Sequence, residues 1–97
     1  MLTDQQAIDA ALAYIAANKL VDDGVRVATK PEWIARVPGA VLVGYNSAEF
    51  VETEDAMVGL LGNMPIRVDD MTGTCRALSM DEYFEVYEPN LPPSQPD

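Results

Sequence analysis

Histidine is absent from this 97-residue sequence, and its absence limits the chemistry available to the protein. Histidine is the commonest general base and the commonest metal ligand, so Ser-His and Cys-His nucleophile pairs are excluded. Gly59 and Gly62 match neither a dinucleotide-binding fingerprint nor a phosphate-binding loop. The sequence therefore predicts that the protein is not an enzyme, and it suggests no cofactor.

Cysteine is also scarce, since Cys75 is the only one in the sequence. No intramolecular disulfide can form, which suits a reducing cytoplasm, and a position within a predicted strand favours a core residue over a reactive thiol. The N-terminus carries Asp4 where a signal peptide would have basic residues, and no apolar run is long enough to cross a bilayer. We therefore expect a cytoplasmic protein.

Basic residues are few, with 6 Lys and Arg against 16 Asp and Glu, which gives a formal net charge of -10. Such a charge repels phosphate backbones and anionic membranes, so neither a nucleic acid nor a membrane is an expected partner. A basic protein is favoured instead. The alternative is that the acidity serves only solubility.

The hydrophobic fraction is that of a folded protein, at 48%, and the length allows one core. We expect a single α+β domain over residues 1–88, followed by a proline-rich tail over residues 89–97. The oligomeric state is not evident from the sequence.

The first predicted element is a helix over residues 4–18, because apolar residues recur there at helical spacing. Thr3 followed by Gln6 is typical of a capping box at its start. Residues 25–29 alternate as in a half-buried strand, and residues 39–47 carry an apolar run typical of a central strand. The type of the segment 32–37 stays open between a helical turn and a strand.

A hairpin is predicted between residues 66–68 and 74–78, because the intervening Asp69 and Asp70 and the late Gly73 favour a tight turn. Ser79 followed by Glu82 predicts a second capping box and a short C-terminal helix. The order α-β-β-β-β-α predicts an α+β fold in which the N-terminal helix packs on a four-stranded antiparallel sheet.

Carboxylates gather in two segments, residues 49–55 and 81–88, which are interleaved with aromatic residues. The stretch of residues 48–55, which contains the first of these segments, is predicted to be an exposed loop or frayed strand. Aromatic side chains can anchor a partner while carboxylates steer a basic one, which predicts a contact surface. Its members would be Tyr45, Glu49, Phe50, Glu52, Glu54, Asp55, Asp81 and Glu85. The alternative is that Phe50, Tyr83 and Phe84 belong mostly to the core. A metal site at Asp69 and Asp70 is disfavoured, because a hairpin turn needs these side chains for its own backbone.

Several motifs, in their order and spacing, resemble the immunity protein 35 family, also called the YrhB-like domain, of bacterial polymorphic toxin systems. They are Tyr45-Asn46-Ser47, Leu61-Gly62-Asn63-Met64-Pro65-Ile66, Val68-Asp69-Asp70-Met71-Thr72-Gly73, Leu78-Ser79 with Glu82-Tyr83 and Tyr87, and the leading helix with Ala7 and Tyr14. One departure is Gly39-Ala40-Val41, where such domains often carry Gly-Trp followed by aromatic residues.

The resemblance implies an immunity protein, that is, a stoichiometric inhibitor that binds a cognate toxin domain in the cytoplasm. It would block the active site of the toxin or hold the toxin in an inactive form. The alternative is a housekeeping binding module or a chaperone-like accessory protein.

Overall fold

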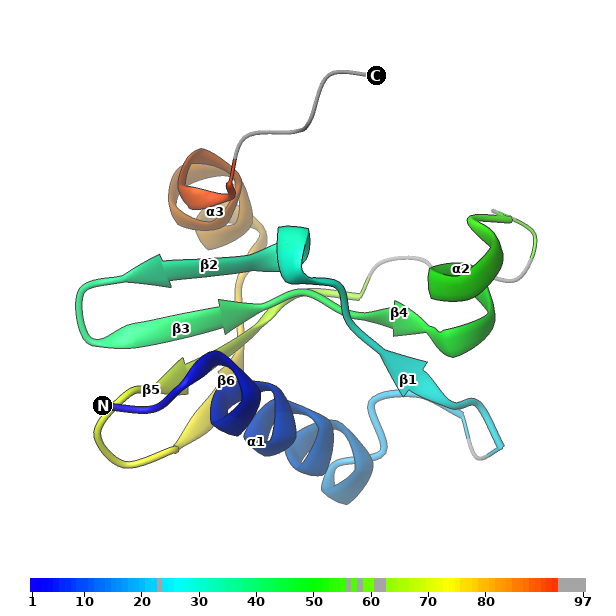
Figure 1. Cartoon of the computed structure of the whole chain (residues 1–97), viewed down its shortest axis with the longest axis horizontal. Coiled ribbons are helices and arrows are strands. Elements are labelled where there is room, and N and C mark those ends of the chain that lie inside the picture. Colours follow the sequence, from blue (N-terminus) through cyan, green and yellow to red (C-terminus); the bar gives the residue numbers. More distant parts are fainter. Residues whose placement is uncertain (23, 56, 58, 61–62, 93–97) are drawn as a thin grey trace.

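The N-terminal helix begins at the predicted capping box. In a computed structural model that describes residues 1–22, 24–55, 57, 59–60 and 63–92, helix α1 spans Asp4–Ala17 (Figure 1). The Thr3 hydroxyl accepts a hydrogen bond from the Gln6 amide at 3.1 Å, and the Gln6 side chain accepts one from the Thr3 amide at 2.9 Å. The predicted helix and its cap are therefore confirmed.

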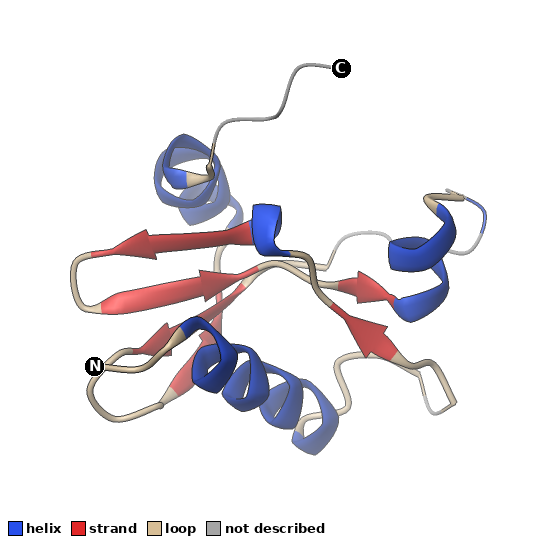
Figure 2. Ribbon diagram, viewed as in Figure 1, coloured by secondary structure: helices blue, strands red, loops and turns tan. Residues whose placement is uncertain are grey.

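The main sheet has four antiparallel strands in the order β2-β3-β5-β6 (Figure 2). Their bounds are Ile34–Val37 for β2, Ala40–Val43 for β3, Ile66–Asp69 for β5 and Cys75–Ala77 for β6. Strand β3 lies between β2 and β5, as expected of a central strand. The predicted α+β fold, with a helix on a four-stranded antiparallel sheet, is confirmed.

One strand of this sheet is not the expected one. The predicted strand at 25–29 is reduced to β1 (Val27–Ala28), which pairs with β4 (Asn46–Ser47) in a separate two-stranded sheet. The place in the main sheet belongs to β2, within the segment whose type was open, after a 3-10 turn at Pro31–Trp33. Because β2 pairs with β3 across a two-residue turn in which Gly39 has φ +82°, this pairing is the most local one available.

The acidic segment after β4 is a helix, so the prediction of a loop or frayed strand over 48–55 is wrong. Helix α2 spans Ala48–Thr53 and ends at Glu54 in the left-handed conformation. Its N-cap is Ser47, whose hydroxyl accepts a hydrogen bond from the Phe50 amide at 3.1 Å. A single capping residue thus starts this helix, without the acidic partner three residues later that marks a capping box.

The hairpin between β5 and β6 is confirmed. Asp69 closes the turn with its side chain, which accepts hydrogen bonds from the Met71 and Thr72 amides at 2.9 and 3.0 Å. These two bonds, in that order, lower the pKa of Asp69. Gly73 has φ +78°, a conformation that favours glycine.

The chain ends in what we call the C-terminal helical segment, residues 80–90. It consists of α3 (Met80–Glu82), a π-helical turn (Tyr83–Tyr87) and a 3-10 turn (Glu88–Asn90). The predicted capping box is confirmed, since Ser79 and Glu82 exchange hydrogen bonds. Helical structure continues past the predicted boundary at residue 88, because Pro89 occupies the first turn of the 3-10 helix, where it needs no amide donor.

The two faces of the sheet carry different helices. Helix α1 covers one face with Ala7, Ala11 and Ile15, and the C-terminal helical segment covers the other with Tyr87. Strand β3 supplies both cores, because alternate residues of a strand point to opposite faces. Cys75 is half-buried and packs against the α1 core, where burial raises the pKa of its thiol. In the described part of the chain, no helix is both long and apolar enough to span a membrane.

Candidate functional site

The four predicted carboxylates of the first acidic segment lie on α2 and directly after it, and all are exposed. Two of them form ion pairs. Glu52 lies 4.0 Å from Arg26, and Glu54 lies 3.0 Å from Lys30. The Arg26–Glu52 pair is open to solvent on both sides, so it stabilises the fold little. In the second pair the Glu54 side chain is exposed, but the Lys30 side chain is largely buried. Glu49 and Asp55 complete the group.

Phe50, also predicted to contact a partner, lies half-buried on α2 and stacks on Trp33 with a ring-centroid distance of 6.3 Å. The Lys30 ammonium lies 5.3 Å from the centroid of the Trp33 ring, within the range of a cation-π contact. Trp33 is not among the residues that the sequence predicts for the contact surface. Its half-buried position beside α2 makes it part of the candidate site instead.

Tyr45 is a correction to the predicted surface. Only 6% of this residue is exposed, and it packs in the core under α1. Burial raises the pKa of its hydroxyl. Tyr45 therefore serves the fold, because it comes directly after the central strand, and a buried ring cannot anchor a partner.

The remaining predicted residues, Asp81 and Glu85, lie exposed on the C-terminal helical segment. Between them in the sequence is Phe84, which is 57% exposed, and Met80 beside it is 58% exposed. The alternative that Phe84 is a core residue is wrong. This set of residues, Met80, Asp81, Phe84 and Glu85, is called the Phe84 ridge below.

The two acidic segments do not form one continuous patch. Helix α2 follows the short β4 strand at one end of the molecule, whereas the Phe84 ridge lies over a face of the main sheet (Figure 1). A cleft opens where β3 ends. Tyr83 and Tyr87 of the C-terminal helical segment line it, and its lining contains no residue of α2 or of the Phe84 ridge.

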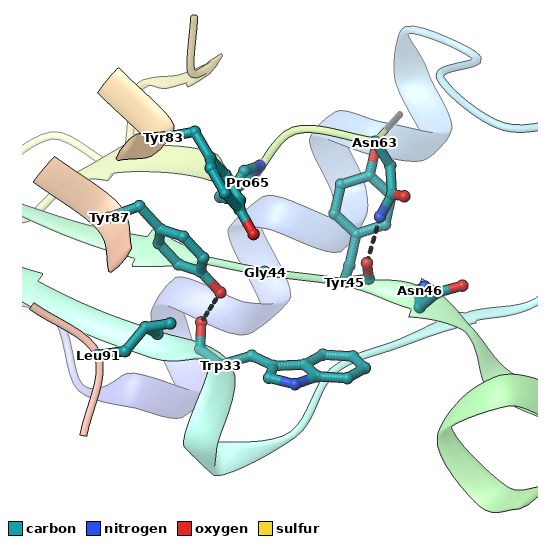
Figure 3. A pocket seen from close by; sticks show the side chains of 9 residues that line it. All are labelled: Trp33, Gly44, Tyr45, Asn46, Asn63, Pro65, Tyr83, Tyr87 and Leu91. Atoms are coloured by element: carbon teal, nitrogen blue, oxygen red, sulfur yellow. Dashed lines mark hydrogen bonds between the residues drawn. The ribbon is translucent and has the colours of Figure 1, made fainter. Parts of the chain in front are cut away.

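This cleft has a volume of about 290 Å³. Its lining is aromatic and amide-bearing, without a charged side chain, and Figure 3 shows it. The residues are Trp33, Gly44, Tyr45, Asn46, Asn63, Pro65, Tyr83, Tyr87 and Leu91. They come from four separate parts of the chain, at residues 33, 44–46, 63–65 and 83–91, so the cleft exists only in the folded protein.

Tyr87 forms one wall of the cleft and fixes its shape. Its hydroxyl donates a hydrogen bond to the Trp33 carbonyl at 2.6 Å, and that carbonyl also accepts one from the Gly44 amide at 3.1 Å. A Cβ at Gly44 would lie 2.2 Å from the Tyr87 hydroxyl, so only glycine fits there. Burial, with a smaller contribution from Tyr83, holds the pKa of Tyr87 far above its usual range. The hydroxyl therefore stays protonated and keeps its donor role.

Two asparagines close the opposite wall. The side-chain carbonyl of Asn46 accepts hydrogen bonds from the Ser47 and Leu60 amides at 2.7 and 2.6 Å. The side-chain amide of Asn63 donates to the Tyr45 carbonyl. These bonds tie the segment before β5 to the strand end beneath it, so the wall needs little rearrangement when the cleft is filled.

The C-terminal helical segment is fastened to the sheet by an ion pair. Arg76 on β6 donates two parallel hydrogen bonds to the Glu82 carboxylate, at 2.8 and 2.7 Å. Arg76, followed by the Ser79 amide, lowers the pKa of Glu82 to about 2. Bidentate pairing of this kind sets orientation as well as distance, so it determines how the Phe84 ridge is presented.

The chain matches no protein-family model, no curated protein and no solved structure. The likeness to the immunity protein 35 family therefore rests on the sequence motifs alone. Three of these motifs have structural roles in or near the cleft, through Asn46, Asn63 and Tyr87. Leu61 and Gly62 of the second motif lie outside the described residues.

Metal binding has no cluster to support it in the part of the chain that is described. No group of three or more Cys, Asp or Glu side chains there could hold a metal ion. Asp69, the strongest candidate in the sequence, directs its side chain at the amides of its own turn. The rings and amide side chains of the cleft can contact and hydrogen-bond another molecule.

Proposed function

We propose that this protein is an immunity protein that binds and neutralises a cognate bacterial toxin domain by direct contact in the cytoplasm. The observation that carries the proposal is the Phe84 ridge, in which an aromatic ring 57% exposed lies between two exposed carboxylates. In the isolated chain the Phe84 ring contacts the Tyr83 ring edge to face, yet more than half of Phe84 stays open to solvent. In a complex it would supply a large apolar anchor at low entropic cost.

Charge supports a basic partner. The net charge of -10 favours approach of a cationic domain, and Asp81 and Glu85 place part of that charge at the anchor. Many toxin domains that act on nucleic acids need a basic surface to bind phosphates, and an acidic protein can cover such a surface. An inhibitor of this kind needs no catalytic group of its own.

Co-expression with the toxin domain encoded beside this gene tests the function. We expect the host to survive and the two proteins to purify together. Continued killing without a complex would overturn the proposal and favour a housekeeping or chaperone-like accessory module.

Phe84→Ala tests the anchor. We expect a loss of affinity of at least about tenfold, as for the central residue of an interface. Met71→Ala is the matched control, because Met71 is 80% exposed but lies in the hairpin turn, at the far end of β5 from the cleft. Equal affinities for the two variants would show that the anchor lies elsewhere.

Charge reversal tests steering. Asp81→Lys with Glu85→Lys should slow association about tenfold. The control, Asp9→Lys with Asp22→Lys, changes the net charge by the same amount on other surfaces. It therefore separates the effect of the position of the charges from the effect of the total charge. Glu52→Lys with Glu54→Lys examines α2 in the same way. Unchanged toxin binding in this last variant would remove α2 from the contact surface and leave the function standing.

A further inference from the structure

The cleft beside the C-terminal helical segment is lined by aromatic and amide-bearing side chains and by no charged one. Tyr83 and Tyr87 project toward Gly44 from one side, and Asn63 lies across from them (Figure 3). Tyr83 connects the cleft to the ridge, because its ring meets the Phe84 ring edge to face at 5.1 Å. A partner that covers Phe84 therefore also covers the mouth of the cleft.

We propose that the cleft receives one arginine side chain of the basic partner, with its guanidinium against the ring of Tyr83. This inference rests on the proposed function for the identity of the partner. The chemistry of the cleft does not depend on the proposed function.

Size favours a single side chain. The volume of about 290 Å³ is at the lower limit of sites that take a small-molecule ligand. An extended arginine side chain needs a narrow space with apolar walls for its methylene groups and an aromatic face for its planar head. The cleft offers both, along Pro65 and Leu91 and at Tyr83.

Charge favours a cation over an anion. The lining has no basic side chain to hold a phosphate or carboxylate, and the protein as a whole carries a formal net charge of -10. The negative faces of aromatic rings attract cations in addition. The chain already contains one such contact nearby, where the Lys30 ammonium lies 5.3 Å from the Trp33 ring centroid.

Arginine is preferred over lysine because the rings and amides suit a planar head. A guanidinium can stack on a tyrosine ring and still donate hydrogen bonds at its edge to carbonyl or hydroxyl oxygens, whereas an ammonium keeps a tight hydration shell. The Tyr87 hydroxyl and the Asn46 and Asn63 side chains are held in place by their own hydrogen bonds. The walls are therefore preorganised, which lowers the cost of binding.

A nuclear magnetic resonance titration tests the inference without any toxin domain. The probe is Nα-acetyl-arginine amide, and the control is the citrulline analogue, which has the same shape but no charge. We expect the arginine probe to shift the amide signal of Gly44, the indole signal of Trp33 and the side-chain amide signals of Asn46 and Asn63, with weak, saturable binding. The citrulline analogue should cause shifts at least about fivefold smaller at the same concentration.

Variants of Tyr83 sharpen the test. Tyr83→Phe keeps the ring and should bind the arginine probe as the original protein does, whereas Tyr83→Leu should bind at least about fivefold more weakly. If Tyr83→Leu fails to fold, the comparison of the two probes on the unaltered protein still tests whether the cleft binds a guanidinium. Equal shifts with both probes, or arginine-induced shifts only at surface carboxylates, would overturn the inference.

The outcomes separate the two proposals. If the arginine probe binds in the cleft but the protein does not protect the host from the toxin domain, the cation site is supported and the immunity function is rejected. If the protein protects the host but the arginine probe does not bind, the immunity function is supported and the cation site is rejected.

Discussion

Each face of the main sheet is covered by one helical element, but the side chains packed on the two faces differ in type. On the α1 face, four strand residues are fully buried under Ala7, Ala11 and Ile15, in a mainly aliphatic core that also holds Tyr45. The strand residues are Val41, Val43, Ile66 and Val68. On the opposite face, the small Ala35 and Ala40 leave room for tyrosine, and the packing ends in a cleft. The difference shows that one face of the sheet carries a closed core, whereas the other combines a smaller core with an open cleft.

Ile66→Ala would weaken the aliphatic face most. Ile66 is 0% exposed, so its truncation leaves a cavity, and we expect the free energy of unfolding to fall by about 2–5 kcal/mol. Urea denaturation measures this loss, with Ile66→Val as a control that should cost about 1 kcal/mol. Binding of the arginine probe by the folded fraction should not change. A reduced affinity for the probe would show that the two faces are not separate in function.

Tyr87→Phe changes the opposite face by one hydroxyl group. Because the Trp33 carbonyl keeps its hydrogen bond from the Gly44 amide, the cost should be that of one ordinary hydrogen bond, about 1 kcal/mol. The wall of the cleft also loses its anchor, so probe binding should weaken even where urea denaturation shows a stable fold. A loss of stability without any loss of probe binding would assign Tyr87 to the core alone.

Glu82→Gln should change the stability of the fold least. The change should be visible mainly in how the stability depends on pH. The pKa of Glu82 is about 2 in the folded protein against an ordinary value of 4.5, so the ionised carboxylate stabilises the fold above the ordinary value. This stabilisation is lost as the pH falls from about 4.5 toward 2. Urea midpoints at pH 7 and pH 3 should therefore differ less in Glu82→Gln than in the original protein.

Arg76→Gln is the matched variant for that measurement, because Arg76 is the largest cause of the lowered pKa. It should remove most of the same pH dependence. If Arg76→Gln keeps the full pH dependence of the original protein, another group is responsible.

Local signals in the sequence predicted local structure well. Both capping boxes and the hairpin turn depend on residues three or four positions apart, and all are present in the structure. Helix α2 was missed because Ser47 has Phe50, and not an acidic residue, three positions later. Strand β2 stayed ambiguous because its identity depends on pairing with β3 and not on its own pattern.

The candidate site depends on long-range packing, and for that reason the sequence predicted it only in part. The exposure of the acidic residues followed from charge, but the separation of α2 from the Phe84 ridge did not. Trp33 and Tyr87 are 54 positions apart, and their hydrogen bond has no local signal. The spacing of Tyr83 and Tyr87, four positions apart, could have indicated a shared side of a helix.

The π-helical turn at Tyr83–Tyr87 also constrains how the length of this chain can change. Its wider hydrogen bond runs from the Glu88 amide to the Tyr83 carbonyl, which accommodates one residue more than an α-helical turn. Deletion of one residue between Tyr83 and Tyr87 would convert this bond into the shorter hydrogen bond of an α-helical turn between the same two residues. The extra residue would be lost from the turn, and Tyr87 would keep its orientation toward Trp33. In alignments of related chains, a gap of one residue at this turn should therefore be compatible with an intact cleft.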